Sequence, residues 1–170
     1  RRSSDLVRRA RALVALARPR GVSVMINDRP DVALLSGADG VHVGREDLSV
    51  ADARAVGGSG LLVGVSCSSV ARARAAESDG ASTIGVGAMF PTSSKARPEV
   101  GGPGLLREVL GDPGVDLPHL AIGGITPENA GEVVAAGARG LAVSSCVCGS
   151  DDPGGVCRAL VETVRETRGR

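Results

Sequence analysis

Aromatic residues are almost missing from this sequence: Phe90 is the only one among 170 residues, with no tryptophan or tyrosine. Proteins that bind single-stranded nucleic acids stack bases on aromatic side chains and attract phosphates with clustered positive charge. This chain has a net charge of only +1, so we expect no nucleic-acid partner. Its core must be filled by Val, Leu, Ile and Ala, which suits parallel strands that helices bury on both faces.

Long apolar runs and paired cysteines are also missing. No run approaches the roughly 20 apolar residues needed to span a bilayer, so we expect no membrane association. Cys67, Cys146, Cys148 and Cys157 contain no C-x-x-C pair, and the only histidines are His42 and His119, far apart in the sequence. We therefore expect no zinc-type site. Without a secretion signal, the sequence predicts a reduced, cytoplasmic protein.

The N-terminal 20 residues hold seven arginines and one aspartate. Such a segment can be a transit peptide or an anion-binding arm. Leu6, Ala10 and Val14 belong, however, to an apolar stripe at helical spacing, which favours an ordinary surface helix. With 42% apolar residues, the length predicts a single domain over residues 1–170.

One unit recurs along the chain: a helix ends in a small-residue turn and passes directly into a short apolar strand. The turns begin at Gly37, Ser78 and Gly137. Alternating helices and strands indicate right-handed βαβ units and a parallel sheet. We predict seven helices, at residues 4–18, 30–36, 49–57, 69–78, 103–111, 127–136 and 153–167. We predict six strands, at residues 22–27, 40–44, 61–66, 82–88, 118–123 and 140–145. A (β/α)₈ barrel needs two more strands, so the pattern indicates an incomplete barrel or an open sheet.

Two successive strand ends carry small residues suited to phosphate. The predicted strand 118–123 runs into Gly123-Gly124, and the next ends at Ser144-Ser145. Backbone amides near glycine can approach an anion closely, and the loops after strands seven and eight of a barrel are a frequent phosphate site. Thr126 is predicted to cap the helix between the two strands. The alternative is that the glycines only form tight turns.

Two aspartates follow neighbouring predicted strands. Asp28 follows the strand 22–27 and Asp47 follows the strand 40–44. Carboxylates placed at one edge of a parallel sheet can hold Mg²⁺ together with water and substrate phosphates. The spacing fits equally well with both residues capping the helices that follow.

Hydroxyl groups and one ammonium group follow the next two predicted strands. Ser66 ends the strand 61–66 and is a candidate ligand-binding hydroxyl. The loop that begins at Pro91 holds Thr92, Ser93, Ser94 and Lys95. These groups can engage phosphate and carboxylate oxygens, and a loop of this length can close over a substrate; the alternative is a solvated linker.

Five motifs, taken in order and spacing, resemble the thiamine phosphate synthase family. They are NDR at 27–29, GADGVHVGREDLS at 37–49, GVS at 64–66, IGVGAMFPTSSK at 84–95 and AIGGITPEN at 121–129. The resemblance implies a (β/α)₈ barrel and a Mg²⁺-dependent transferase of thiamine biosynthesis. This enzyme joins a hydroxymethylpyrimidine diphosphate to a thiazole phosphate and releases pyrophosphate. The resemblance implies that these two small molecules are the partners of the chain, and a homo-oligomer stays open.

The resemblance also implies the roles of individual residues. Asp28 and Asp47 would bind Mg²⁺, while Asn27, Ser66 and Lys95 would hold the pyrimidine diphosphate, with Ser66 and Lys95 as catalytic residues. The thiazole phosphate and its carboxylate would be held by Thr92, Ser93, Ser94, Gly124, Ser144 and Ser145. In the implied mechanism, loss of pyrophosphate leaves a pyrimidine-methyl cation that the thiazole nitrogen captures.

The chain departs from the family pattern at three points. The first strand, helix and second strand of the family, with a Gln-x-Arg-x-Lys motif, have no counterpart, which predicts a barrel incomplete at its N-terminal side. Arg45 replaces a usual Gln, and Ser68 stands where many relatives have His. A related thiazole tautomerase subfamily tends to use that His and to lack the second carboxylate, so Ser68 and Asp47 favour the synthase. The alternatives are such a tautomerase and a non-catalytic phosphate-ligand barrel.

Overall fold

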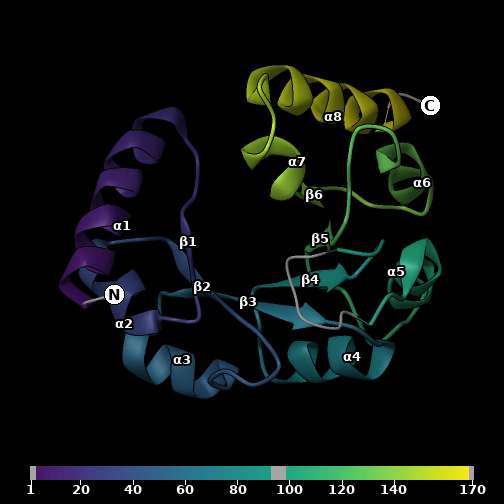
Figure 1. Ribbon diagram of the computed structural model, residues 1–170. Coiled ribbons are helices and arrows are strands. Elements are labelled where there is room, and N and C mark those ends of the chain that lie inside the picture. The colour runs from purple at the N-terminus through teal and green to yellow at the C-terminus, as the bar shows by residue number, and fades with distance from the viewer. Residues whose placement is uncertain (1–2, 93–98, 169–170) are drawn as a thin grey trace. The chain divides into compact units, whose positions relative to one another are not determined.

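A computed structural model describes residues 3–92 and 99–168 of the chain (Figure 1). The chain forms two compact units. The first contains the residues up to Ser66 together with residues 78–83, and the second contains residues 67–77 together with the residues from Ile84 onward. None of the helices in the described ranges combines the length and apolar character that a bilayer span requires.

The first unit alternates helices with three short parallel strands. Its elements are α1 (Ser3–Ala17), the 3₁₀ helix η1 (Arg18–Arg20), β1 (Met25–Asn27), α2 (Pro30–Ser36), β2 (Gly40–Val43), α3 (Val50–Gly57) and β3 (Leu62–Cys67). Strand β2 lies between the other two: Gly40 pairs with Met25 on one side and with Leu62 on the other. Helix α2 contacts both α1 and α3, as the purple and blue ribbons of Figure 1 show.

Local sequence signals explain where the helices of this unit begin and end. Pro30 opens α2, where its missing N–H costs nothing, and Gly37 ends the helix in the left-handed conformation (φ +70°). The Ser49 side chain caps α3 by accepting a hydrogen bond from the Asp52 N–H at 3.1 Å. The core between helices and strands is aliphatic, as expected from the shortage of aromatic residues; its most buried members are Ala33, Val41, Val43, Ala53 and Val63.

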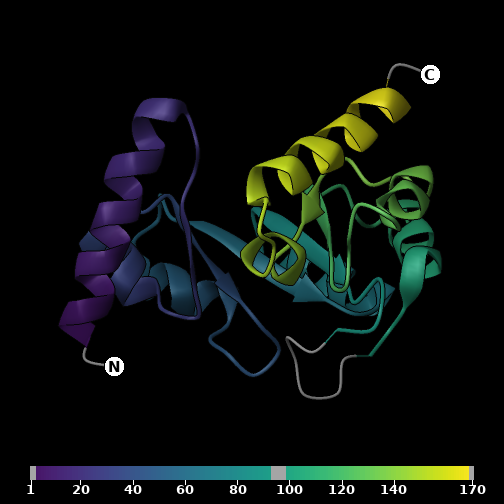
Figure 2. The ribbon, with the colours of Figure 1, turned by 45° about the horizontal axis from the view of Figure 1, so that its top comes forward.

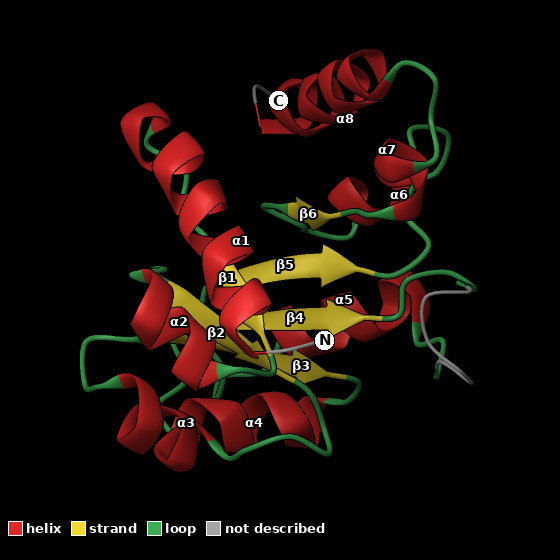
Figure 3. Ribbon diagram, turned by 60° about the vertical axis from the view of Figure 1, so that its left-hand side comes forward, coloured by secondary structure: helices red, strands yellow, loops and turns green. Residues whose placement is uncertain are grey.

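The second unit has the same alternation. Its elements are α4 (Val70–Ser78), β4 (Thr83–Gly87), α5 (Gly102–Leu110), β5 (His119–Ile122), α6 (Ala130–Ala135), β6 (Leu141–Ala142), α7 (Ser145–Cys148) and α8 (Pro153–Arg168). Strand β5 pairs in parallel with β4 and with β6, and the arrows of β4 and β5 point the same way in Figure 3. The C-terminal helix α8 packs on α6 and α7 (Figure 2).

A paired arginine and aspartate join α4 to the loop after α5. Arg74 donates from Nε and Nη2 to the two carboxylate oxygens of Asp112, at 2.8 and 2.7 Å. These hydrogen bonds lower the pKa of the Asp112 carboxyl. One turn further along α4, Glu77 accepts from the Asp116 N–H at 2.8 Å. Helix α4 is therefore held to this loop by two side chains with defined geometry.

The six predicted strands are all present, and most predicted helices end within two residues of the observed ones. Strand β1 is shorter than predicted because the Val24 N–H donates to the Asp39 carboxylate at 2.7 Å instead of to a neighbouring strand. The predicted strand 140–145 ends at Ala142. Beyond it the Ser144 carbonyl accepts the N–H groups of Val147 and Cys148, which makes Ser145 the first residue of α7, a helix that the sequence did not predict.

Helix α5 offers a test of core packing. Leu106 is 0% exposed, whereas Leu110, one turn later, is 36% exposed. We expect Leu106→Ala to lower the free energy of unfolding by about 2–5 kcal/mol, because it removes apolar contacts and leaves a cavity. Leu110→Ala should lower it clearly less. Urea unfolding followed by far-UV circular dichroism measures both, and equal losses would contradict the packing described for α5.

His119 makes the stability of the second unit dependent on pH. Burial lowers the pKa of its imidazole below the ordinary value of 6.5, and Nε2 accepts the Arg139 N–H at 3.3 Å, which requires this nitrogen to be unprotonated. The folded state therefore binds fewer protons than the unfolded state. The contribution of His119 to the free energy of unfolding should be fully present above about pH 6.5, and it should decline as the pH falls through the lowered pKa.

The measurement is the free energy of unfolding between about pH 7 and pH 5, the range around the ordinary pKa of histidine. The His119→Asn variant should show a shallower decline than the unchanged chain. His42 is present in both proteins, so the difference between the two curves reports His119. Parallel curves would show that His119 does not contribute.

Candidate active site

The carboxyl ends of β1, β2 and β3 bring one group of polar residues to the same edge of the first unit. Asn27 is the last residue of β1 and Asp28 follows it. Asp47 lies in the loop after β2, and Ser66 is the penultimate residue of β3. Parallel pairing aligns the carboxyl ends of these strands, so these residues, predicted from the sequence, share one edge of the sheet.

Asp28 has an unusual backbone conformation. Its φ is +62°, and it is the only non-glycine residue with a positive φ in the described part of the chain. Its N–H donates to the His42 carbonyl at 2.9 Å, which continues the β1–β2 pairing past the end of the strand. Aspartate is one of the few residues that tolerate this conformation, and such positions gather at functional sites.

Asp28 and Asp47 do not cap the helices that follow them, which was the alternative role that the sequence allowed. The N-cap residue of α2 is Arg29 and that of α3 is Ser49. Asp47 closes its own loop instead, because its Oδ2 accepts the Gly44 N–H at 2.7 Å. Within the described ranges its Oδ1 has no hydrogen-bond partner, and the side chain is exposed.

A histidine that the sequence analysis did not assign to the site contacts Ser66. His42 Nε2 lies 2.9 Å from Ser66 Oγ, across the β2–β3 pairing in which His42 is opposite Gly64. A Cβ atom at position 64 would lie 2.7 Å from His42 Nδ1, so glycine makes room for the imidazole. The contact fixes the direction of the Ser66 hydroxyl, whose donor or acceptor role follows from the tautomer of His42. The predicted strand 40–44 included His42, but only the β2–β3 register pairs it with Ser66.

The cysteine next to Ser66 has a structural role. Cys67 is 1% exposed, and burial raises the pKa of its thiol to about 11. Since the thiolate is the reactive form of cysteine, Cys67 is protonated at neutral pH and is not a nucleophile. It serves as a small core residue.

The residues at this edge of the sheet suit a Mg²⁺ ion that keeps water and substrate ligands better than a metal ion that is held by protein side chains alone. Over residues 3–92 and 99–168 no cluster of three His, Cys, Asp or Glu side chains could hold a metal ion. Mg²⁺ is commonly held by one or two carboxylates, with water and substrate phosphate as its other ligands. Asp28 and Asp47 follow adjacent strands and are not the N-cap residues of the helices that follow. Their carboxylate oxygens are the kind of donor atom that such a Mg²⁺ site uses.

In the second unit, Gly123 and Gly124 form a tight loop after β5. Their φ values are +101° and +66°. A Cβ atom on Gly124 would lie 2.6 Å from the Pro91 carbonyl oxygen, and one on Gly123 would lie 2.8 Å from Ala88 Cβ. Both glycines are therefore required by backbone conformation and by the close approach of the segment after β4. Gly123 and Gly124 therefore form a tight turn, which is the alternative that the sequence left open. Their N–H groups are also available to a ligand, because neither has an acceptor within the described residues.

Asn129 holds this glycine loop in place. Its Oδ1 accepts the Thr126 N–H at 2.8 Å and its Nδ2 donates to the Gly124 carbonyl at 3.0 Å. The prediction that Thr126 caps the helix is wrong: α6 starts at Ala130 with Asn129 as its N-cap residue. The Thr126 side chain instead lowers the pKa of the Glu128 carboxyl.

The structure describes only some of the remaining predicted site residues. Ser144 and Ser145 are exposed at the start of α7, and their N–H groups have no acceptor in the part of the chain that the structure describes. Thr92 is half-buried at the end of the segment that packs against Gly124. Ser93, Ser94 and Lys95 lie outside the described residues, so their roles stay predictions.

Known structures show which fold these units represent. The chain superimposes on a thiamine phosphate pyrophosphorylase from Pyrococcus furiosus with a TM-score of 0.91 and 34% identity, covering 98% of this chain and 79% of that one. A 3-hexulose-6-phosphate synthase from Salmonella typhimurium gives a TM-score of 0.68 at 16% identity, which is a likeness of fold alone. The chain therefore has an α/β fold of the TIM-barrel type, with six parallel strands of an incomplete barrel, as the sequence predicted.

Sequence comparisons agree with the structural likeness. Thiamine-phosphate synthases from Chlorobium luteolum and Moorella thermoacetica are 44% and 43% identical to the chain, over 96% and 98% of its length. The chain spans 77% and 79% of these two proteins, and 32% of the thiamine biosynthesis bifunctional protein ThiM/ThiE of Symbiobacterium thermophilum. The family model described as thiamine monophosphate synthase matches residues 1–147. The chain thus belongs to the thiamine monophosphate synthase family.

Proposed function

We propose that this chain carries the active site of a thiamine phosphate synthase, a transferase that joins a hydroxymethylpyrimidine diphosphate to a thiazole phosphate with release of pyrophosphate. The observation that carries the proposal is the combination of family membership over most of the chain with polar residues at the carboxyl ends of its strands. Active sites of parallel α/β folds form at this end. We further propose that residues 1–170 act as one domain in the cytoplasm.

The first unit is proposed to hold the pyrimidine diphosphate. Asn27 and Ser66 would donate or accept hydrogen bonds to this substrate, and His42, at 2.9 Å from Ser66 Oγ, would keep the serine hydroxyl in one direction. Asp28 and Asp47 would hold Mg²⁺, which, when bound, neutralises charge on the diphosphate as it leaves. Lys95 is proposed to supply a second positive charge to the same leaving group.

The second unit is proposed to hold the thiazole phosphate. Its phosphate oxygens would accept hydrogen bonds from the amides of Gly124, Ser144 and Ser145, which have no acceptor in the described ranges. Thr92, Ser93 and Ser94 would bind the remaining phosphate and carboxylate oxygens. Held in this way, the thiazole nitrogen would be positioned to capture the pyrimidine-methyl cation, so orientation rather than a strong base would drive the step.

A second candidate function is binding of thiazole phosphate without turnover. One observation favours it: one face of β5 is open, with Leu120 43% exposed and Ile122 39% exposed, while Ala121 between them is buried. In this alternative the second unit binds its ligand, and the residues for pyrimidine diphosphate are insufficient.

The carboxylates test the synthase proposal. We expect the double variant Asp28→Asn and Asp47→Asn to lower Mg²⁺-dependent formation of thiamine phosphate by at least about 100-fold, because charge neutralisation on the leaving group is lost. Thiochrome fluorescence after incubation with both substrates measures the product. Asp79→Asn, an exposed turn residue outside the site, is the matched control and should keep full activity. Unchanged turnover in the double variant would refute the assignment.

Gly124 tests the phosphate loop independently of turnover. We expect Gly124→Ala to weaken thiazole phosphate binding at least about tenfold by calorimetry, because its Cβ would meet the Pro91 carbonyl and its φ is +66°. Gly131→Ala in α6 meets no atom within 4 Å and should bind normally. Calorimetry with pyrimidine diphosphate then separates the two functions: the synthase must bind both substrates, whereas the alternative predicts thiazole phosphate alone.

A further inference from the structure

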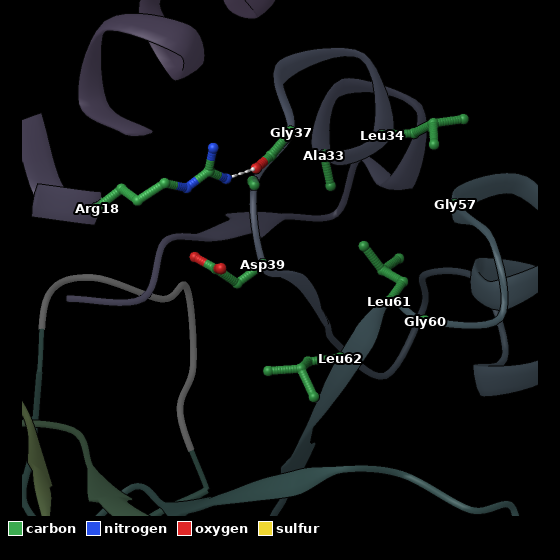
Figure 4. A pocket seen from close by; sticks show the side chains of 10 residues that line it. Arg18, Ala33, Leu34, Gly37, Asp39, Gly57, Gly60, Leu61 and Leu62 are labelled. Atoms are coloured by element: carbon green, nitrogen blue, oxygen red, sulfur yellow. Dashed lines mark hydrogen bonds between the residues drawn. The ribbon is translucent and has the colours of Figure 1, made fainter. Parts of the chain in front are cut away.

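The first unit has a pocket at the end of its strands opposite to the candidate active site. It lies at the amino ends of β2 and β3 and beside the carboxyl ends of α2 and α3, and its volume is about 460 Å³. This volume is within the range of about 300–1,000 Å³ that is usual for small-molecule sites. The lining side chains that matter here are those of Arg18, Asp39, Leu61 and Leu62 (Figure 4).

Two opposite charges line this pocket without pairing with each other. Arg18 Nη2 donates to the Gly37 carbonyl at 2.7 Å, which leaves the other guanidinium N–H groups without a partner in the described residues. Asp39 Oδ2 accepts the Val24 N–H at 2.7 Å, and its Oδ1 is likewise unused there. Each charge is therefore anchored by one backbone hydrogen bond and keeps capacity for a ligand.

The rest of the pocket is apolar or has no side chain. Leu61 faces the two charged residues across the pocket and Leu62 lies beneath them, while Leu34 points away (Figure 4). Leu62 is 44% exposed although it opens a strand. Space in the pocket comes from Gly37, which needs its left-handed conformation to end α2, and from Gly60, where even a Cβ atom would meet no neighbour.

We propose that this pocket binds a small aliphatic α-amino acid as a zwitterion. The ligand carboxylate pairs with the Arg18 guanidinium, the ligand ammonium pairs with the Asp39 carboxylate, and the aliphatic side chain contacts Leu61 and Leu62. Charge-assisted hydrogen bonds of this kind are about twice as strong as neutral ones. A ligand with only one charge would leave either Arg18 or Asp39 unpaired, so the pocket selects for both charges together.

The ligand requirement is tested on the unchanged chain by calorimetry with three compounds of similar shape. L-leucine carries both charges, isopentylamine carries only the ammonium, and 4-methylpentanoate carries only the carboxylate. We expect L-leucine to bind at least about tenfold more tightly than either of the others. No heat of binding with L-leucine up to about 10 mM, or equal binding of a singly charged compound, overturns the proposal.

Two variants test the proposed partners. Asp39→Asn keeps an oxygen for the Val24 N–H but removes the charge, and Arg18→Gln removes the guanidinium. Each should weaken L-leucine binding at least about tenfold, with folding checked by circular dichroism. Arg20→Gln, on the same 3₁₀ helix but not lining the pocket, and Asp79→Asn are the matched controls and should bind normally. A loss confined to one of the two pocket variants, or to neither, overturns the zwitterion.

None of these experiments depends on synthase activity. The Asp28, Asp47 and Gly124 variants alter residues that do not line the pocket and should bind L-leucine as the unchanged chain does. Failure of the pocket proposal therefore leaves the synthase proposal intact, and the reverse also holds.

Discussion

The parallel register of β1, β2 and β3 is the constraint on which the first unit depends. Pairing of Met25 with Gly40, and of Gly40 with Leu62, aligns the beginnings of the three strands. It therefore aligns their ends as well, and the hydrogen bond from the Asp28 N–H to the His42 carbonyl extends this order beyond β1. A slip of β2 by one residue would turn His42 away from Ser66 and exchange the buried and exposed faces of β2.

The second unit depends instead on close contact between two loops. Gly123 and Gly124 lie so near the segment from Ala88 to Pro91 that a single methyl group would collide with it. Hydrogen bonds from the Met89 N–H to the Ile122 carbonyl and from the Phe90 N–H to the Gly123 carbonyl join the two loops, and the Asn129 side chain bonds the Gly124 carbonyl and the Thr126 N–H. These contacts restrain the loop, and a restrained loop loses less entropy when a ligand binds to it.

Opposite ends of the same strands serve different purposes. At their carboxyl ends the first unit presents residues shared with the synthase family motifs. At their amino ends Asp39 both shortens β1, by bonding the Val24 N–H, and lines the pocket with Arg18. One carboxylate thus connects the start of the sheet with a second candidate ligand site. In a parallel sheet this separation follows from topology, because all strands run in one direction and each end of the sheet collects one kind of loop.

Local chemistry was enough to predict most of the elements and the family. Pro30 and Gly37 bound α2 through their own backbone restrictions, and five motifs in order indicated the fold and the family. Contacts between distant residues needed the tertiary structure. His42 meets Ser66 only through strand register, and Ser145 begins α7 instead of extending β6. Arg29 and Ser49 take the cap positions that would have occupied Asp28 and Asp47. Residue type limits what a side chain can do, but the pairing of distant backbone segments decides which partner it meets.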